Sequence, residues 1–391
     1  MKKTLGVTFT KGISLQKWYD TGLLGREKLI YEEHLRKGRF EKIYWFTYGC
    51  EDKKLRDRLV CEGKLDERIE IVPCPWYGEF FGLRLIYSAR MHNVHKDICK
   101  EIDVIKTNQM EGAWAAGEIA KRYQIPLLLR TGYTYSSLIK NSNVHTIYSR
   151  LKRSIQYKFY MQVEKSLYQQ CDLAEVSSIH DQRYICRTCN LSGDKVRLLV
   201  NYIDCSLFYP TDNERISDRL LFVGRLHEVK NLHTVIMAVR NCNVGLDIYG
   251  AGDLKEGLEQ YARQVGADVQ FMGTCPNEEL PRIYRKYRYF ILASLYEGMP
   301  KTLLEAMACG CVCLGTNVDG IEEVLEDHVT GFVASNVSEA VVTETLREMI
   351  AYENWRLISE NAALFIQKEF SLEGVADKEW ENISQILVDK C

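Results

Sequence analysis

The stretch RYFILASLYEGMPKTLLEAMACGCVCLGT, residues 288–316, is predicted to form a strand, a loop, a helix and a second strand in succession. The runs RYFILAS and CVCLGT have the length and apolar composition of buried strands. Between them, Pro300 stands at a favourable first position for the helical segment KTLLEAMAC. Continuous apolar strands joined through a helix are typical of a parallel sheet covered on both faces. The stretch therefore predicts an α/β fold.

The same alternation recurs along the chain in two series. The first half contains the strand-like runs TLGVTFT, KIYWFTY, IEIVP, DVIKTN, PLLLR, DLAEVSS and VRLLV. The second half contains RLLFVG, VGLDIYG, DVQFMG, RYFILAS, CVCLGT and GFVAS. Longer periodic segments, such as Leu15–Lys37 and Tyr148–Gln170, separate the runs and are predicted to be helical. Two such series predict two Rossmann-like domains, with the junction near the polar segment 200–218.

Composition and charge restrict the classes of protein to which the chain can belong. With 391 residues, 46% of them hydrophobic and 27% charged, the chain is expected to fold into buried cores. No run approaches twenty apolar residues, so we expect no membrane-spanning helix, and MKKTLGVTFT is predicted to be a first strand rather than a signal peptide. Residues 1–200 hold 34 Lys and Arg against 23 Asp and Glu, a net +11; the remainder holds 17 against 30, a net −13. The uneven charge indicates two bodies with different partners.

The 14 cysteines are spread through apolar segments rather than set at the spacings of a disulfide framework. This distribution predicts reduced thiols in a cytosolic protein. The pair Cys186 and Cys189, with His180 nearby, could bind zinc or could be a plain pair on a helix surface. No second pair of ligands accompanies it, and no Asp-x-Asp triplet stands at a strand end. We therefore expect no metal and no other cofactor.

Polar residues and glycines follow three strands of the second series. Gly224 allows a tight turn, and Arg225 and Lys230 come after it, which suits a diphosphate because Arg grips oxygens with two N–H groups and Lys adds a point charge. A solvated loop is the alternative. Gly250 and Gly252 make a similar sharp turn after the next strand. Because the carboxyl ends of parallel strands meet at one edge, these loops are expected to lie together.

The opening stretch supplies a helix N-terminus with a carboxylate on either side. Backbone N–H groups of Thr302 and Leu303 are predicted to form an anion site. Glu305 is the only charge in an apolar run, and its carboxylate could accept hydrogen bonds from a ribose diol. Glu297, in the loop, would meet the part of the ligand beyond the phosphates. Alternatively, Glu297 caps the helix and Glu305 pairs with a neighbouring base.

Together these segments resemble the donor-binding domain of retaining GT-B glycosyltransferases of family 4. The resemblance rests on FVGRLHEVKN, DIYGAGD, FMG, LASLYEGMPKTLLEAMACGCVCLGT and DGIEEVLEDHVTGF, between Arg219 and Phe332. It implies a GT-B fold, in which two Rossmann-like domains face each other across a cleft. The implied domains are an acceptor-binding domain, residues 1–200 joined by a C-terminal helix at about 371–391, and a nucleotide-sugar-binding domain, residues 201–370.

The resemblance also implies roles for single residues. Arg225 and Lys230 would neutralise the diphosphate leaving group, and Glu297 would contact the donor sugar near its reacting face. Donor-binding positions are implied at Gly12, Gly224, Gly250, Gly252, Thr302, Leu303 and Glu305. The implied reaction is transfer of a sugar with retention of configuration.

The first half matches the family only loosely. Gly12 lies in the first strand–helix loop, where it could bring backbone close to the donor or could simply turn the chain. Asn108 ends a strand in the region where many relatives place a histidine that touches the sugar. With Arg130 and Thr131 after another strand, it is assigned to the acceptor side; a plain surface position is the alternative for Arg130.

The expected acceptor is a glycan or a lipid-linked saccharide of cell-surface polysaccharide or glycoconjugate synthesis. The basic, aromatic-rich segment YSRLKRSIQYKFYMQVEKSLY, residues 148–168, could dock on an anionic membrane surface or could be a solvated helix face. The expected location is the cytoplasm, at the cytosolic membrane face if the helix docks. Nucleic acid is not expected as a partner, because no base-stacking module accompanies the basic half. The alternatives are a nucleotide-sugar epimerase or hydrolase and a non-catalytic nucleotide-sugar-binding protein.

Overall fold

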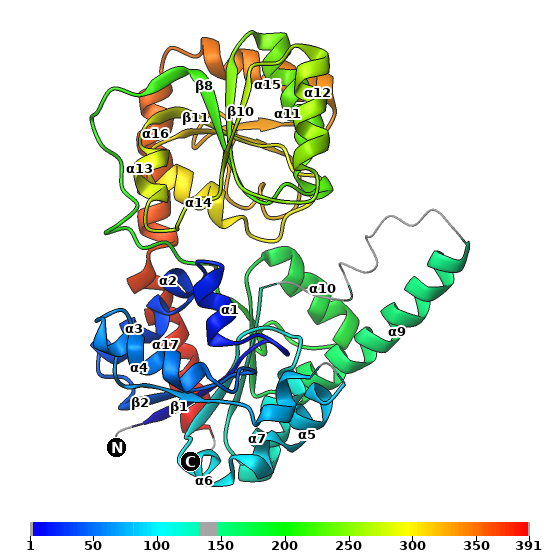
Figure 1. Ribbon diagram of the computed structural model, residues 1–391, viewed down its shortest axis with the longest axis vertical. Coiled ribbons are helices and arrows are strands. Elements are labelled where there is room, and N and C mark those ends of the chain that lie inside the picture. Colours follow the sequence, from blue (N-terminus) through cyan, green and yellow to red (C-terminus); the bar gives the residue numbers. More distant parts are fainter. Residues whose placement is uncertain (1–2, 81, 133–135, 137–146, 390–391) are drawn as a thin grey trace. The chain divides into compact units, whose positions relative to one another are not determined.

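The structure is a computed structural model that describes residues 3–80, 82–132, 136 and 147–389 (Figure 1). The chain divides into two compact units. Unit 1 comprises Met1–Leu199 and Ala376–Cys391, and unit 2 comprises Val200–Val375. Each unit is built on its own parallel sheet, so each can be described by itself.

The sheet of unit 1 has seven parallel strands in the order β3-β2-β1-β4-β5-β6-β7. The strands are β1 (Thr4–Thr8), β2 (Lys42–Phe46), β3 (Ile69–Val72), β4 (Val104–Thr107), β5 (Leu127–Thr131), β6 (Leu173–Val176) and β7 (Val196–Leu198). The helices between them are α1 (Leu15–Asp20), α2 (Leu24–Glu27), α3 (Leu29–Arg36), α4 (Asp52–Cys61), η1 (Trp76–Glu79), α5 (Arg84–Val94), α6 (Lys96–Cys99), α7 (Ala113–Tyr123), α9 (Ile147–Gln170) and α10 (Ile179–Cys189). The central strand β1 pairs with β2 on one side and with β4 on the other.

The sheet of unit 2 has six parallel strands in the order β10-β9-β8-β11-β12-β13. The strands are β8 (Ile216–Val223), β9 (Gly245–Tyr249), β10 (Val269–Gly273), β11 (Tyr287–Leu292), β12 (Val312–Thr316) and β13 (Phe332–Ala334). The helices are η2 (Glu228–Lys230), α11 (Leu232–Cys242), α12 (Lys255–Val265), α13 (Leu280–Tyr284), α14 (Lys301–Ala308), α15 (Glu339–Ala351) and α16 (Trp355–Glu369). The last helix, α17 (Leu372–Val388), begins in unit 2 and belongs to unit 1 from Ala376 onward. Figure 1 shows α11, α12 and α15 on one face of this sheet and α13, α14 and α16 on the other.

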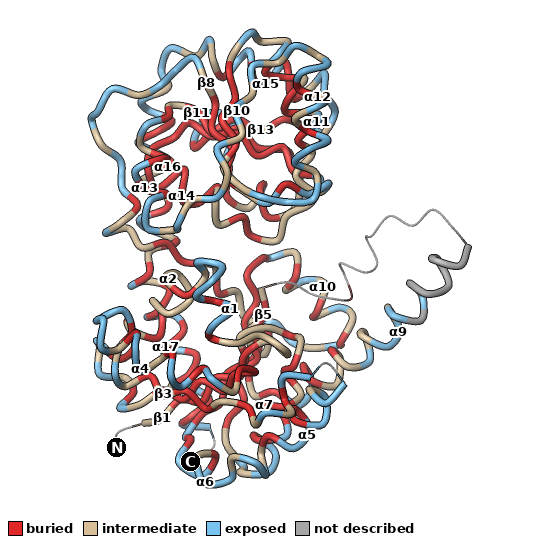
Figure 2. The backbone as a smooth tube through the Cα atoms, in the orientation of Figure 1, coloured by how far each residue is buried: buried red, intermediate tan, exposed pale blue. Residues whose placement is uncertain are grey.

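These elements confirm the predicted α/β class. Each of the thirteen apolar runs coincides with one strand, and most of the strands are buried between helices (Figure 2), whereas the edge strand β10 is half-exposed. One helix prediction is wrong: the segment 15–37 forms three short helices instead of one long one. Gly22 has φ +71°, a left-handed conformation that an α-helix cannot continue through, so α1 ends just before it.

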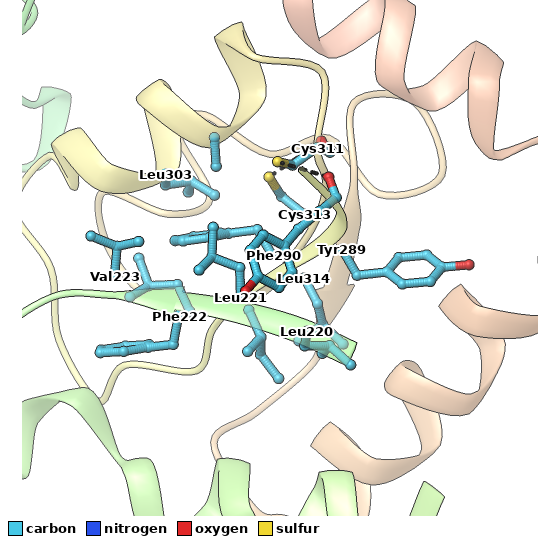
Figure 3. Close-up of a cluster of buried hydrophobic side chains, with 14 of the residues drawn as sticks. Leu220, Leu221, Phe222, Val223, Tyr289, Phe290, Leu303, Cys311, Cys313 and Leu314 are labelled. Atoms are coloured by element: carbon cyan, nitrogen blue, oxygen red, sulfur yellow. Dashed lines mark hydrogen bonds between the residues drawn. The ribbon is translucent and has the colours of Figure 1, made fainter. Parts of the chain in front are cut away.

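The core of unit 2 explains why the second series of strands is so apolar. Figure 3 shows Leu221 of β8 beside Phe290 of β11, its partner across the sheet, while Phe222 of β8 points to the opposite face; all three side chains are fully buried. Cys311 joins them, and its Sγ donates to the Tyr284 carbonyl at 3.2 Å. Burial raises the pKa of the Cys311 thiol to about 12, so it remains protonated and acts as a small core side chain.

The cysteine pair of the first half lies on α10, where Cys186 is half-buried and Cys189 is buried. Within the described ranges, no three His, Cys, Asp or Glu side chains gather closely enough to hold a metal ion.

The C-terminal part of α17 is held on unit 1 by a buried charge cluster, which comprises His34, Lys106, Glu175 and Glu379. Glu379 contacts His34 Nε2 through Oε2 at 2.8 Å and pairs with Lys106 through Oε1. Asn382 of the same helix donates to Glu175 Oε1 at 2.8 Å. Burial alone would raise the pKa of Glu379, but Lys106 and His34 hold it below its usual range. Burial and the Glu379 charge raise the pKa of Glu175 to about 8.

We expect the stability of unit 1 to fall between pH 5 and pH 8 because of Glu175. In the folded state its pKa is raised to about 8, well above that of an ordinary glutamate, so ionisation is easier in the unfolded chain throughout this window. The stabilisation that Glu175 contributes is complete at low pH and is lost as the pH rises to the pKa of Glu175 in the folded state. Glu175→Gln, which cannot ionise, should flatten the dependence of the urea midpoint on pH. The exposed Glu118→Gln on α7 is the control, and equal slopes in all three proteins would contradict the assignment.

Candidate functional site

The strand order of unit 2 places two distant loops at one edge. β8 has β9 on one side and β11 on the other. After β8 the chain adds β9 and β10 on one side of it, and then crosses over to add β11 on the opposite side. The loops that follow β8 and β11 therefore diverge from adjacent strand ends. Open α/β sheets bind ligands at this topological switch point. The predicted residues Arg225, Lys230 and Glu297 all lie in these two loops.

Backbone hydrogen bonds fix the loop after β8. Gly224 N–H donates to the Tyr249 carbonyl at 2.9 Å, which ties it to the end of β9. Leu295 N–H, in the loop after β11, donates to the Val229 carbonyl at 2.8 Å. Arg225 lies exposed on this anchored loop. The loop therefore presents its cations from a backbone that is held on both sides.

Lys230 and Glu297 meet directly across the switch point. Lys230 Nζ forms an ion pair with Glu297 Oε1, and Ser294 Oγ donates to the same oxygen at 2.6 Å. The two charged side chains are only 16% and 12% exposed. A partly desolvated pair of this kind is stronger than an exposed one, and it places a cation and a carboxylate at one point of the surface. The structure therefore brings together the two residues predicted for the leaving group and the sugar.

Three glycines allow neighbouring loops at this edge to pack closely. A Cβ on Gly250, whose φ is +154°, would lie 1.8 Å from the Gly224 carbonyl oxygen. A Cβ on Gly320, whose φ is +75°, would lie 1.9 Å from the Gly298 carbonyl oxygen, beside Glu297. Gly252 is equally confined, since its Cβ would lie 2.3 Å from the Leu226 carbonyl oxygen. Only glycine permits such close approach of one loop backbone to the next.

Glu305 lies on α14 and is 2% exposed. Tyr284 Oη donates to its Oε2 at 2.9 Å. Burial, together with the Glu305 carboxylate, raises the pKa of Tyr284 well above its usual value, so the phenol stays a donor. The Glu305 carboxylate, the only charge in its apolar run, thus has a protein partner in the Tyr284 hydroxyl.

The N-terminus of α14 differs in part from the prediction. Leu303, whose N–H was predicted to meet phosphates, donates instead to the Pro300 carbonyl at 3.1 Å, and its side chain is fully buried. The reason is that Pro300 caps the helix from an extended conformation, so its carbonyl already accepts the first intrahelical bonds. Thr302, one residue earlier, is half-buried in the first turn.

The candidates of unit 1 fall into two groups. Gly12, with φ +79°, follows β1, and Asn108 follows β4, so both lie at the switch point of the first sheet. Arg130 and Thr131 end β5. The Arg130 guanidinium donates to the Leu199 carbonyl at 2.7 Å. Thr131 is 1% exposed, and its hydroxyl lies 3.3 Å from the Tyr168 hydroxyl. A small polar residue at a strand end does not reveal whether a neighbouring helix covers it.

Two residues at the unit 2 site escaped the sequence reasoning. Ser294 orients Glu297, and Tyr284 holds Glu305. Ser294 could have been found, because it ends the strand that precedes Glu297. Tyr284 gives no such signal, since it comes from α13 and meets α14 only through packing.

Comparison with known proteins agrees with this geometry. Residues 213–363, most of unit 2, match the family model of glycosyl transferases group 1. The chain is 35% identical over 151 residues to the putative glycosyltransferase EpsF of Bacillus subtilis, which covers 34% of this chain and 38% of that protein. It is 26% identical over 218 residues to the Campylobacter jejuni "GalNAc-alpha-(1->4)-GalNAc-alpha-(1->3)-diNAcBac-PP-undecaprenol alpha-1,4-N-acetyl-D-galactosaminyltransferase", covering 54% of this chain and 59% of that protein. The chain thus spans between about two fifths and three fifths of these relatives.

A solved structure extends the likeness to both units. Alr3699/HepE of Anabaena, in complex with UDP and glucose, has a TM-score of 0.75 at 16% identity and covers 98% of this chain and 100% of that one. The predicted GT-B class of α/β fold is therefore confirmed.

Proposed function

We propose that the protein is a retaining glycosyltransferase that moves a sugar from a nucleotide-diphosphate sugar to an acceptor. The observation that carries the proposal is the Lys230–Glu297 pair at the switch point of unit 2, inside the segment that matches glycosyl transferases group 1. A cation and a carboxylate held at one point suit a ligand whose phosphate carries negative charge and whose sugar carries hydroxyl groups.

The proposed chemistry is loss of a nucleotide diphosphate from the anomeric carbon. Negative charge develops on the leaving phosphate, so fixed cations are expected to be the main source of rate enhancement. Lys230 and Arg225 would supply them, and Glu297 would hold the sugar once Lys230 turns to phosphate. Glu305 would accept hydrogen bonds from the ribose. Attack from the same face would retain configuration, which the anomeric coupling constant of the product would test.

We infer that the acceptor is a glycan or a lipid-linked saccharide. The Campylobacter relative is named for a PP-undecaprenol-linked substrate, and unit 1 is rich in basic residues. Every helix within the described ranges is too short or too polar to span a bilayer. Docking through residues 148–168 stays a proposal; the side chains of 147–153 and of 155, like Lys140, lie outside the described part of the chain. Co-sedimentation with anionic vesicles tests the docking.

Nucleotide binding is the first test. Of UDP, GDP and ADP, one is expected to raise the thermal midpoint of the full chain, because a ligand that binds only the folded state stabilises it. Glu305→Ala should weaken that nucleotide by about tenfold or more, since a hydrogen bond to a charged group contributes about 1.5–3 kcal/mol. Glu360→Ala, on α16 and exposed, is the matched control. Failure of all three nucleotides to shift the midpoint would count against a nucleotide-sugar site.

Transfer is expected to proceed without a bound metal. Lys230 and Arg225 take the charge-neutralising role that a divalent cation would otherwise fill. Turnover measured in excess EDTA should therefore equal turnover in its absence. Loss of activity in EDTA that Mg²⁺ or Mn²⁺ restores would overturn the metal-independent proposal while leaving the transferase proposal intact.

Release of nucleotide separates the remaining candidates. A transferase should release the diphosphate only slowly until an acceptor is added. An epimerase or hydrolase would convert the sugar nucleotide at the same rate with or without an acceptor, and a binding protein would convert none. The sugar and the acceptor can then be identified by screening against the preferred nucleotide.

A further inference from the structure

The chain enters unit 2 through residues 200–204, the entry segment, and leaves it through residues 370–375. Backbone hydrogen bonds join the two segments: Ile203 N–H donates to the Phe370 carbonyl at 2.8 Å, and Leu372 N–H donates to the Ile203 carbonyl at 2.9 Å. The Ile203 side chain is 3% exposed and packs in the core of unit 2. The entry segment therefore has a fixed backbone, from which its other side chains can hold neighbouring groups in place.

Asn201, in the entry segment, contacts the loop that carries Glu297. Its Nδ2 donates to the Met299 carbonyl at 3.0 Å, although 98 residues separate the two positions in sequence. Met299 is 8% exposed and follows Glu297 by two positions. Because the hydrogen bond is partly buried, water would replace a lost amide donor only in part. Asn201 therefore anchors the loop just beyond Glu297, in addition to the contacts that the carboxylate itself makes.

Tyr202 makes a second contact from the entry segment. Its ring lies against Lys301, whose Nζ is 5.3 Å from the ring centre, and Tyr202 is 9% exposed. Lys301 is the first residue of α14. A cation at that position opposes the positive end of the helix dipole, and the face of an aromatic ring offsets part of this repulsion. The contacts from Asn201 and Tyr202 thus lie on either side of Pro300, where the loop becomes α14.

We propose that Asn201 and Tyr202 are positioning residues of the donor site, which set where Glu297 lies by fixing the loop that follows it. The inference rests on the proposed transfer from a nucleotide sugar, in which Glu297 contacts the sugar. A catalytic group that is misplaced by about 1 Å loses much of its effect on the reacting atoms, so the anchor of its loop matters to the rate. Neither positioning residue needs to touch the ligand, because both act through the loop.

Amide hydrogen exchange on the full chain tests the anchor without any substrate. In Asn201→Ala, exchange in the peptide 295–304 should be about tenfold faster than in the parent protein, the factor expected from loss of one hydrogen bond. Tyr202→Leu should accelerate the same peptide by about two- to fivefold, whereas Tyr202→Phe, which keeps the ring, should match the parent protein. Asn361→Ala is the matched control and should leave the peptide unchanged, because Asn361 Nδ2 donates to a different carbonyl of unit 2, that of Val329, at 3.2 Å. Unchanged exchange in Asn201→Ala would overturn the proposal, and unchanged exchange in Tyr202→Leu would remove Tyr202 from it.

Kinetics with an identified donor test the consequence for the reaction. Asn201→Ala should lower kcat by about tenfold or more through misplacement of Glu297, and should leave the affinity for UDP, GDP or ADP, whichever raises the thermal midpoint, within about twofold. In a Glu297→Ala background the same substitution should change kcat by less than about twofold, because the group that Asn201 positions is absent. A merely structural role predicts equal losses of kcat in both backgrounds together with weaker nucleotide binding, and either result would overturn the assignment.

The outcomes separate this inference from the proposed function. A parent protein that turns over no sugar nucleotide would defeat the transferase proposal, and hydrogen exchange would still decide whether Asn201 anchors the loop. Transfer by the parent protein with a kcat that Asn201→Ala leaves unchanged would defeat this inference alone.

Discussion

Lys230→Ala and Glu297→Ala are each expected to lower kcat for sugar transfer by about 10²–10³-fold. Removing one fixed group that stabilises charge developing in a transition state typically costs this much. The Lys230→Ala variant would lack the contact with the leaving phosphate, and the Glu297→Ala variant would lack the contact with the donor sugar. The paired geometry adds a second expectation: because the two side chains contact each other, the double variant should lose less than the product of the two single losses.

The measurement is kcat and KM with an identified donor, together with thermal unfolding of each variant. Both variants should unfold cooperatively, with midpoints within a few degrees of the parent protein. Lys255→Ala is the control, because Lys255 forms an exposed helical pair with Glu259 at 3.7 Å in the same unit. Turnover near that of the parent protein in either site variant would refute the assignment of this pair.

Gly250→Ala is expected to damage both the stability of unit 2 and nucleotide binding. The new Cβ would lie 1.8 Å from the Gly224 carbonyl oxygen, a distance at which backbone must move. Movement of Gly224 would break its hydrogen bond to Tyr249 and displace the loop that presents Arg225 and Lys230. We expect a loss of about 3 kcal/mol or more, which corresponds to a fall in the thermal midpoint of roughly 6–12 °C.

Gly266→Ala provides the matched control for this strain. Gly266 ends α12 with φ +68°, and a Cβ there meets no atom within 4 Å. Its replacement should lower the free energy of unfolding by only about 1 kcal/mol, because alanine must adopt the left-handed conformation, and should leave nucleotide affinity unchanged. Equal destabilisation by the two substitutions would show that conformation alone, rather than close approach to Gly224, confines Gly250.

The sequence predicted the sheets better than it predicted the site. A buried parallel strand must be apolar on both faces, so a run such as RLLFVG or CVCLGT can be predicted to be a strand from its own composition. The edge of the sheet at which Lys230 and Glu297 lie was also predictable, since both follow strand ends. Their ion pair was not, because it depends on β8 and β11 being neighbours although 67 residues separate the two side chains.

Other predicted site residues show the same dependence on packing. Thr131 was predicted for the acceptor side, and in the structure Tyr168 of α9 lies against it. Leu303 was expected to offer its N–H to phosphate, but the conformation of Pro300 directs a carbonyl to it. A sequence pattern states which groups a residue carries, and only the packing of other elements decides which of those groups remain accessible.

The sequence by itself determined the α/β class, the thirteen strands, the glycine turns at the strand ends and the chemical types available there, because these depend on local composition and periodicity. The tertiary structure alone decided the pairing of Lys230 with Glu297 and the burial of Glu305 against Tyr284. Each of these joins segments from different parts of the chain. Strand order and helix packing bring such segments within a few ångströms of each other, and no local pattern encodes that distance.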